Sequence, residues 1–104
     1  MIDFAGTMND ADTQYKIVQD ILHQGVCEVE FTKINGEHRV MKCTLHRDWM
    51  PSEAIREHHQ TRLYDPETIS VWDTDKQAWR SFKTMRVITV KLIDHGTETL
   101  DSNP

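Results

Sequence analysis

Two alternating runs of residues on either side of the dipeptide Asn35-Gly36 constrain the fold of this chain more than any other feature. The runs cover residues 26–34 and 38–45, and each alternates in the way that a half-buried strand does. An Asn-Gly pair between two such runs is a strong signal for a β-hairpin. The side chains expected on the buried face are Cys27, Val29, Phe31, Met41, Cys43 and Leu45.

The length of the turn decides which side chains share a face, because a one-residue slip moves every side chain to the other side of the sheet. A two-residue turn would place Val29 opposite Lys42 and would mix apolar and charged side chains on both faces. A three-residue loop, either 34–36 or 35–37, keeps the apolar set together. We therefore predict the three-residue loop, with Gly36 in a left-handed conformation that glycine adopts without steric cost.

A helix is predicted before the hairpin, over residues 9–24, because Tyr15 and Val18 begin an apolar stripe at helical spacing. Asn9 or Asp10 would cap its start, and Gly25 would cap its end in a left-handed conformation. Three further strands are predicted at residues 68–72, 78–84 and 86–93, with a polar turn at 73–77 between the first two.

The stretch 46–66 is the least regular, and we predict a long loop with a short helix that starts near Pro51. Ala54, Ile55 and His58 would face inward for about two turns of this helix. Residues 1–8 show no periodicity and are expected to be flexible, and residues 94–104 are expected to form a polar tail. A chain of 104 residues suits one domain, which we place at residues 9–93.

Five short strands joined mostly by tight turns predict a mostly β (α+β) fold, namely a small five-stranded SH3/Sm-like barrel with an N-terminal α-helix. Closure into a barrel would remove the sheet edges that otherwise recruit other chains. No apolar run approaches the ~18 residues of a membrane helix, and the first residues do not resemble a secretory signal. We therefore expect a cytoplasmic protein without a membrane partner, in which Cys27 and Cys43 are buried, reduced thiols.

The net charge of −5 is unevenly distributed. Residues 1–30 carry −5 and residues 94–104 carry −3, whereas residues 31–63 carry +2 and residues 64–93 carry +1. The strongly basic footprint of a typical nucleic-acid-binding domain is missing. The middle of the chain is still able to form a local basic face, while the acidic balance as a whole favours protein partners over polyanions.

Three segments carry a family resemblance. They are Val29–Lys33 with Arg39–Leu45, then Ile69–Asp73, and then Ala78–Lys83 followed by Val87. Together they resemble a phage-encoded, WYL-like family with an Sm/SH3-type β-barrel, over about residues 26–93, without the N-terminal helix and the tail. The resemblance implies the barrel fold, and a phage protein would work in the cytoplasm of the host cell.

The third segment also resembles the closing part of bacterial WYL domains, which reads roughly W-R-x-F-R-x-x-R-I. The matching positions are Trp79, Arg80, Phe82, Lys83, Arg86 and Val87. WYL domains typically sense nucleotides or nucleic-acid ends, so the resemblance implies an anionic ligand near Arg80, Lys83 and Arg86. The sequence departs from those larger domains because it lacks a clear Trp-Tyr-Leu strand.

The basic-aromatic stretch is also the best candidate site from chemistry alone, because aromatic rings stack on bases and guanidinium groups bind phosphates. Strand alternation places Arg80 and Phe82 on one face and Trp79 and Lys83 on the other. One of these faces must be core, so the two aromatic rings are not both exposed. The expected contacts to nucleic acid or a nucleotide are Arg80, Lys83 and Arg86, with Arg39 and Lys42 as secondary contacts.

A second hypothesis is a protein-interaction module that binds and modulates a host protein of transcription or defence. Trp49 and Met50, beside Pro51, are its candidate anchor, because Trp and Met are enriched at interface centres. The same pair would alternatively cap the barrel.

Signals for catalysis, metals and cofactors are missing from the sequence. The four glycines are isolated, so the chain has no phosphate-binding loop or dinucleotide fingerprint. The histidines and cysteines lack the paired short spacings of a zinc site, and Asp73 and Asp75 are explained as turn residues. We therefore expect a small non-enzymatic accessory or regulatory protein with no metal and no cofactor.

Overall fold

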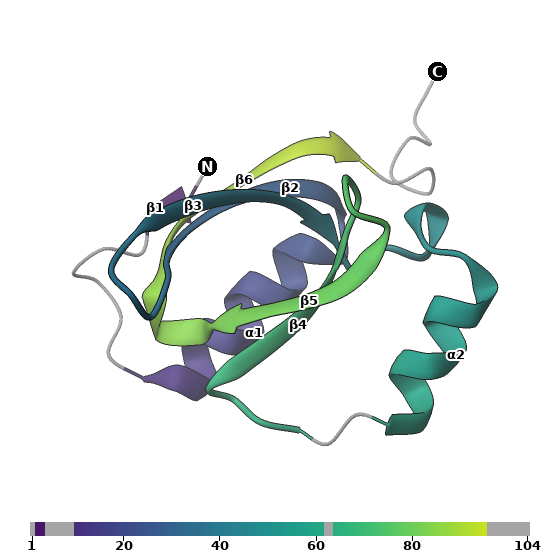
Figure 1. Cartoon of the computed structure of the whole chain (residues 1–104), viewed down its shortest axis with the longest axis horizontal. Helices are drawn as coiled ribbons and strands as arrows, with labels where there is room; N and C mark the ends of the chain where they lie inside the picture. Colours follow the sequence, from purple (N-terminus) through teal and green to yellow (C-terminus); the bar gives the residue numbers. More distant parts are fainter. Residues whose placement is uncertain (1, 4–9, 62–63, 96–104) are drawn as a thin grey trace.

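A curved antiparallel sheet wraps around one side of helix α1 in the computed structural model, which describes residues 2–3, 10–61 and 64–95 (Figure 1). The strand order is β1-β6-β2-β3-β4-β5, and helix α2 lies at one end of the domain, away from α1 (Figure 1). In chain order the elements are β1 (Ile2–Asp3), α1 (Ala11–Leu22), β2 (Gly25–Thr32), β3 (His38–Thr44), η1 (Arg47–Trp49), α2 (Ser52–Thr61), β4 (Thr68–Asp73), β5 (Ala78–Lys83), η2 (Thr84–Arg86) and β6 (Val87–His95).

The hairpin of β2 and β3 has one of the two registers that the predicted three-residue loop allowed. Val29 lies opposite Met41, and the N–H of Lys33 donates to the carbonyl of Glu37 at 2.7 Å. The loop between these two residues is therefore 34–36, one of the two three-residue loops that the alternation allowed. Gly36 has a φ of 92°, as the tight turn requires.

Helix α1 begins at a capping aspartate. The carboxylate of Asp10 accepts the N–H of Asp12 at 3.3 Å and the hydroxyl of Thr13 at 2.6 Å, which satisfies the first free donors of the helix. Tyr15 and Val18 are buried on the face that packs on the sheet. The predicted helix is confirmed, with ends two residues inside the predicted range of 9–24.

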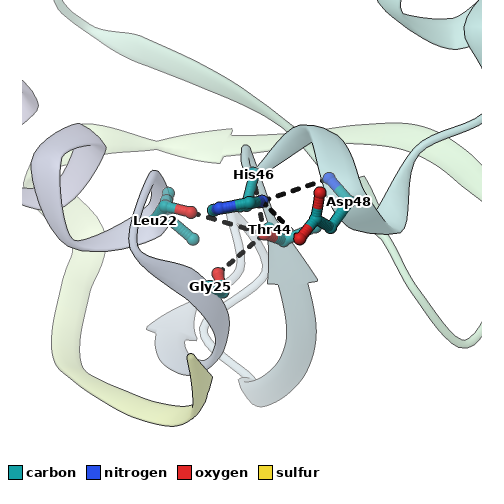
Figure 2. A network of polar contacts seen from close by, with 5 residues as sticks. All are labelled: Leu22, Gly25, Thr44, His46 and Asp48. Atoms are coloured by element: carbon teal, nitrogen blue, oxygen red, sulfur yellow. Dashed lines mark hydrogen bonds and ion pairs between the residues drawn. The ribbon is translucent and has the colours of Figure 1, made fainter. Parts of the chain in front are cut away.

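The prediction of a left-handed cap at Gly25 was wrong. The helix ends at Leu22, and Gly25, with a φ of 158°, is already part of β2. The reason is that the segment at the end of β3 satisfies the end of the helix: the carbonyl of Leu22 accepts the N–H of Leu45, just after β3, at 3.0 Å. The hydroxyl of Thr44 also lies 3.3 Å from that oxygen and donates to the Gly25 carbonyl at 2.7 Å (Figure 2).

The core lies between the concave face of the sheet and α1. It contains all six hairpin side chains that were predicted to share a face, together with Ile69, Val71, Phe82, Val87 and Val90. Cys27 and Cys43 lie directly opposite each other, and both are free, buried thiols. Burial raises the pKa of Cys27 to about 12 and that of Cys43 well above its usual range, since a thiolate would lose its hydration there.

The five main strands with an N-terminal helix confirm the predicted SH3/Sm-like architecture, but the expected closure of the sheet is not found in the described part of the chain. Strand β4 pairs with β5 along its whole length, whereas it pairs with β3 only through Cys43 and Thr44. The hairpin of β4 and β5 then diverges from β3. As a result β1 and β5 are edges of the described sheet, and no described strand pairs with the first half of β3 on its β4 side.

The ends and the connecting stretch differ in detail from the sequence expectations. Ile2 and Asp3 pair with β6 as strand β1, although residues 1–8 were expected to be flexible; the others of that range lie outside the described residues. Strand β6 extends to His95, two residues into the predicted tail. The short helix after Pro51 is α2, in which Ala54 is buried and the side chain of His58 lies outside the described residues.

Candidate ligand-binding groove

A groove of about 550 Å³ lies where β3 and the hairpin of β4 and β5 diverge. It is bordered by the tip of the first hairpin on one side and by β5 and η2 on the other. Its volume falls within the range of small-ligand pockets, roughly 300–1,000 Å³. The residues that line the groove are of three kinds. The apolar ones are Phe31, Ile34, Met41 and Phe82, and the basic ones are Lys33, Arg39, Arg80, Lys83 and Arg86. The uncharged polar ones are Thr32, Asn35, Thr68 and Ser81.

The floor of the groove is apolar and aromatic. The rings of Phe31 and Phe82 are stacked, with centroids 5.0 Å apart and planes at 26°. Both residues are buried core members that also line the groove. Ile34, at the hairpin tip, is 78% exposed, so it offers apolar surface at the rim. A flat apolar group of a ligand can rest on this floor.

The rim carries five bases, and no carboxylate is among the described residues that line the groove. Lys83 donates to the Thr68 hydroxyl at 3.2 Å, and Arg86 donates to the Lys33 carbonyl at 3.4 Å. These contacts orient the two cations without neutralising their charge. Arg39 likewise has no ion pair with the acids of the described chain, so three predicted cations are available to an anion.

Arg80 is in a different situation from the other bases. Its guanidinium lies 3.7 Å from the carboxylate of Asp73, which is only 6% exposed. The same carboxylate accepts the N–H groups of Asp75 and Lys76 at 2.9 Å each, so Asp73 fixes both the β4–β5 turn and Arg80. Arg80 was predicted as a contact together with Lys83 and Arg86, and it does line the groove, but it differs from them in having an ion pair within the protein.

Lys42, the other predicted secondary contact, is not among the residues that line the groove. It lies opposite Glu28, and its side chain is on the other face of β3 from Arg39 and Met41, because neighbouring residues of a strand point to opposite faces. Sequence reasoning also missed Lys33 at the hairpin tip. The signal was present in the three-residue loop, which places Lys33 at the end of the strand that carries Phe31.

The aromatic residues outside the groove have local packing partners. Trp79 is half-buried against Trp72, with ring centroids 5.6 Å apart, so Phe82 rather than Trp79 supplies the aromatic surface of the groove. Trp49 is half-buried, with its ring 5.3 Å from that of His46 in an edge-to-face arrangement. Met50 is also half-buried, so the pair predicted as a partner anchor presents only part of its surface.

His46 belongs to a polar network that joins α1, β3 and η1 (Figure 2). Its N–H donates to the Thr44 hydroxyl at 2.9 Å, and its Nδ1 accepts the N–H of Asp48 at 3.1 Å. These contacts give His46 a structural role as the cap of η1. Within the described residues, no cluster of three or more potential metal ligands occurs, and neither helix is long and apolar enough to cross a membrane.

Comparison with known proteins agrees with the fold. Residues 15–88 match the WYL_2 family, which is described as having an Sm-like SH3 β-barrel fold. The chain belongs to this family. The match begins at Tyr15, inside α1, so the family includes most of the helix that the sequence resemblance had left out. The protein is thus a small member of a WYL-like family.

One relative is the "uncharacterized 11.5 kDa protein in Gp31-cd intergenic region" of Enterobacteria phage T4. It is 34% identical over 76 residues, which cover 72% of this chain and 74% of the relative. No solved structure matches the chain.

Proposed function

We propose that the groove binds a nucleotide or a short single-stranded nucleic-acid segment, and that the protein acts as a non-enzymatic accessory or regulatory factor of a phage. The observation that carries this proposal is the combination of an aromatic floor with cations that face no carboxylate of the described groove lining. Arg39, Lys83 and Arg86 would bind phosphate oxygens, and a base would rest on the surface that Phe31 and Phe82 share.

The shape and charge of the groove favour a nucleotide or a single strand over a duplex. The bases of a duplex are stacked and paired, so they do not reach a recessed floor. The net charge of −5 also works against a long polyanion, whereas a short segment contacts only the local cluster of bases.

The chemistry of the lining supports binding without catalysis. It offers hydroxyl groups, one amide and five bases. The most common general bases are histidine and the carboxylates, and the described lining contains neither. We therefore include the absence of enzyme activity in the proposal.

The test is fluorescence anisotropy with labelled single-stranded DNA, single-stranded RNA, duplex DNA and a labelled nucleotide. If three cations contact phosphates, a fourfold rise in salt concentration, from about 50 to 200 mM, should lower the affinity for a single strand roughly twentyfold. Lys83→Ala with Arg86→Ala leaves one contact, so the same rise in salt should weaken the residual binding only about threefold.

Lys42→Ala is the matched control, because it removes a base of the same hairpin that lies outside the groove. Binding by this variant should equal that of the unmodified protein. The proposal is rejected if the unmodified protein binds none of the four probes, or if Lys42→Ala lowers affinity as much as the double variant does.

A further inference from the structure

The hydrogen-bonding groups of the groove lining are mostly donors. Its five basic side chains donate and do not accept, and no aspartate, glutamate or histidine is among the described residues that line the groove. The other polar side chains of the lining are Thr32, Asn35, Thr68 and Ser81. The contacts that these side chains already make within the protein decide which of them still offer an oxygen to a ligand.

The side-chain amide of Asn35 has a fixed orientation at the tip of the first hairpin. Its Oδ1 accepts the N–H of Glu37 at 3.0 Å. Since only the oxygen of an amide accepts a hydrogen bond from a backbone N–H, this contact shows which end of the amide is the oxygen. Asn35 is exposed and lines the groove, so its Nδ2, with two N–H donors, is the group that the turn leaves to a ligand.

Two further oxygens at the rim are used as acceptors within the protein. The hydroxyl of Thr68 accepts a hydrogen bond from the Nζ of Lys83 at 3.2 Å, which leaves the hydroxyl proton to be donated. The carbonyl of Lys33 accepts the N–H of Gly36 at 2.8 Å and a guanidinium N–H of Arg86 at 3.4 Å. The acceptors of the rim are therefore largely occupied, whereas its donors are not.

The nucleic-acid bases differ in how many donors they present to such a site. Guanine, adenine and cytosine each carry an exocyclic amino group, which needs an acceptor. Thymine and uracil carry carbonyl oxygens in its place, and a ring N–H is their only donor. A site poor in acceptors leaves a buried amino group unpaired, which is costly. The lining of this groove therefore matches the carbonyl-rich pyrimidines better than the other bases. The hydroxyls of Thr32 and Ser81 both donate and accept, so they do not oppose this bias.

We propose that the groove prefers thymine or uracil to bases that carry an amino group, and that the Nδ2 of Asn35 donates to a carbonyl oxygen of the pyrimidine ring. This inference rests on the function proposed above. The ring would rest on the floor formed by Phe31 and Phe82. Asn35 and Phe31 line the groove from the same hairpin, so a ring on this floor presents one edge toward the hairpin tip. Asn35 selects the base, while the cations bind the phosphates.

The experiment is fluorescence anisotropy with labelled oligomers of deoxyuridine or deoxycytidine, each about six nucleotides long, which is a usual site size for a small barrel. The two probes have the same backbone and the same number of phosphates, and they differ only at ring positions 3 and 4. The unmodified protein should bind the deoxyuridine oligomer at least about tenfold more tightly, because a donor of the protein would face the amino group of cytosine.

Asn35→Asp tests the role of this residue. Aspartate also accepts the N–H of Glu37 and therefore keeps the turn, but its second oxygen replaces the two donors with an acceptor. The preference for the deoxyuridine oligomer should be lost, while the added negative charge weakens the binding of both oligomers. Asn35→Ser keeps the turn without adding charge, so it provides the same comparison if the aspartate variant binds too weakly to measure.

Gln24→Glu is the matched control. It adds the same charge at an exposed position that does not line the groove, and it should keep the full preference for the deoxyuridine oligomer. If this control also loses the preference, the loss in Asn35→Asp is an effect of charge and the role of Asn35 is rejected. A preference that is unchanged in Asn35→Asp and Asn35→Ser rejects it as well.

The base preference and the groove proposal fail separately. Equal affinity of the unmodified protein for the two oligomers rejects the base preference alone, because the cations and the aromatic floor would still bind both. If the unmodified protein binds neither oligomer at about 1 mM, the groove proposal is rejected, and the base preference is rejected with it.

Discussion

Thr44 joins three elements of the domain, and its replacement by valine gives a sharp test of the packing described above. Its side chain is fully buried. The hydroxyl donates to the Gly25 carbonyl at 2.7 Å and accepts the His46 N–H at 2.9 Å. Valine has nearly the same shape, so Thr44→Val removes these hydrogen bonds without opening a cavity.

The expected loss follows from the groups left unsatisfied. A buried donor or acceptor without a partner costs about 1–3 kcal/mol, so we expect Thr44→Val to lower the free energy of unfolding by roughly 2 kcal/mol. For a domain of this size, that corresponds to a fall of about 10 °C in Tm. The measurement is thermal and urea unfolding followed by circular dichroism, with the slope against urea expected to be unchanged.

Thr89→Val is the matched control for this prediction. Thr89 lies on β6, is half-buried, and makes no side-chain hydrogen bond within the described structure. Its replacement should change the free energy of unfolding by less than about 0.5 kcal/mol. If Thr44→Val is as stable as Thr89→Val, the network of Figure 2 does not hold α1 against β3, and the reasoning is refuted.

Three other predictions concern single groups. Since burial raises the pKa of Cys27 to about 12 and that of Cys43 well above its usual range, iodoacetamide at pH 8 should modify these thiols only when the protein unfolds; rapid labelling of the folded protein would contradict their burial. The Tyr64 hydroxyl donates to Asp12, which raises the pKa of Tyr64 to about 12. This contact should stabilise the fold fully below about pH 10 and be lost as the pH rises toward 12, and an absorbance titration should show a late tyrosinate step that Tyr64→Phe removes. Gly36→Ala should cost about 1 kcal/mol, because a left-handed φ is unfavourable for alanine, while a cost near zero in urea unfolding would argue against that turn conformation.

The hairpin could be predicted from the sequence because its information is local. One face of β2 and β3 is buried, and a three-residue loop, unlike a two-residue turn, keeps Cys27, Val29 and Phe31 with apolar partners on that face. The same alternation separates Lys42 from Arg39. Arg39 and Lys42 have opposite parity on one strand, so they do not both reach one groove.

The features that escaped prediction depend on contacts between distant segments. The opening of the sheet follows from how few residues of β3 pair with β4, and no local pattern encodes that number. Asp73 was predicted as a turn residue, which is correct, but its second role as the partner of Arg80 required the strand pairing to be known. The end of α1 was mispredicted at Gly25 because β3 supplies the missing hydrogen bonds.

The most direct test of the groove as a binding site is an NMR titration of the ¹⁵N-labelled protein with a short single-stranded thymidine oligonucleotide. Binding in the groove predicts saturable shifts in the amides of residues 31–35, 39–41 and 80–86, with little change in η1 and α2. Saturable shifts confined to η1 and α2, around Trp49, would place the ligand elsewhere and contradict the central claim, as would the absence of any shift at millimolar oligonucleotide.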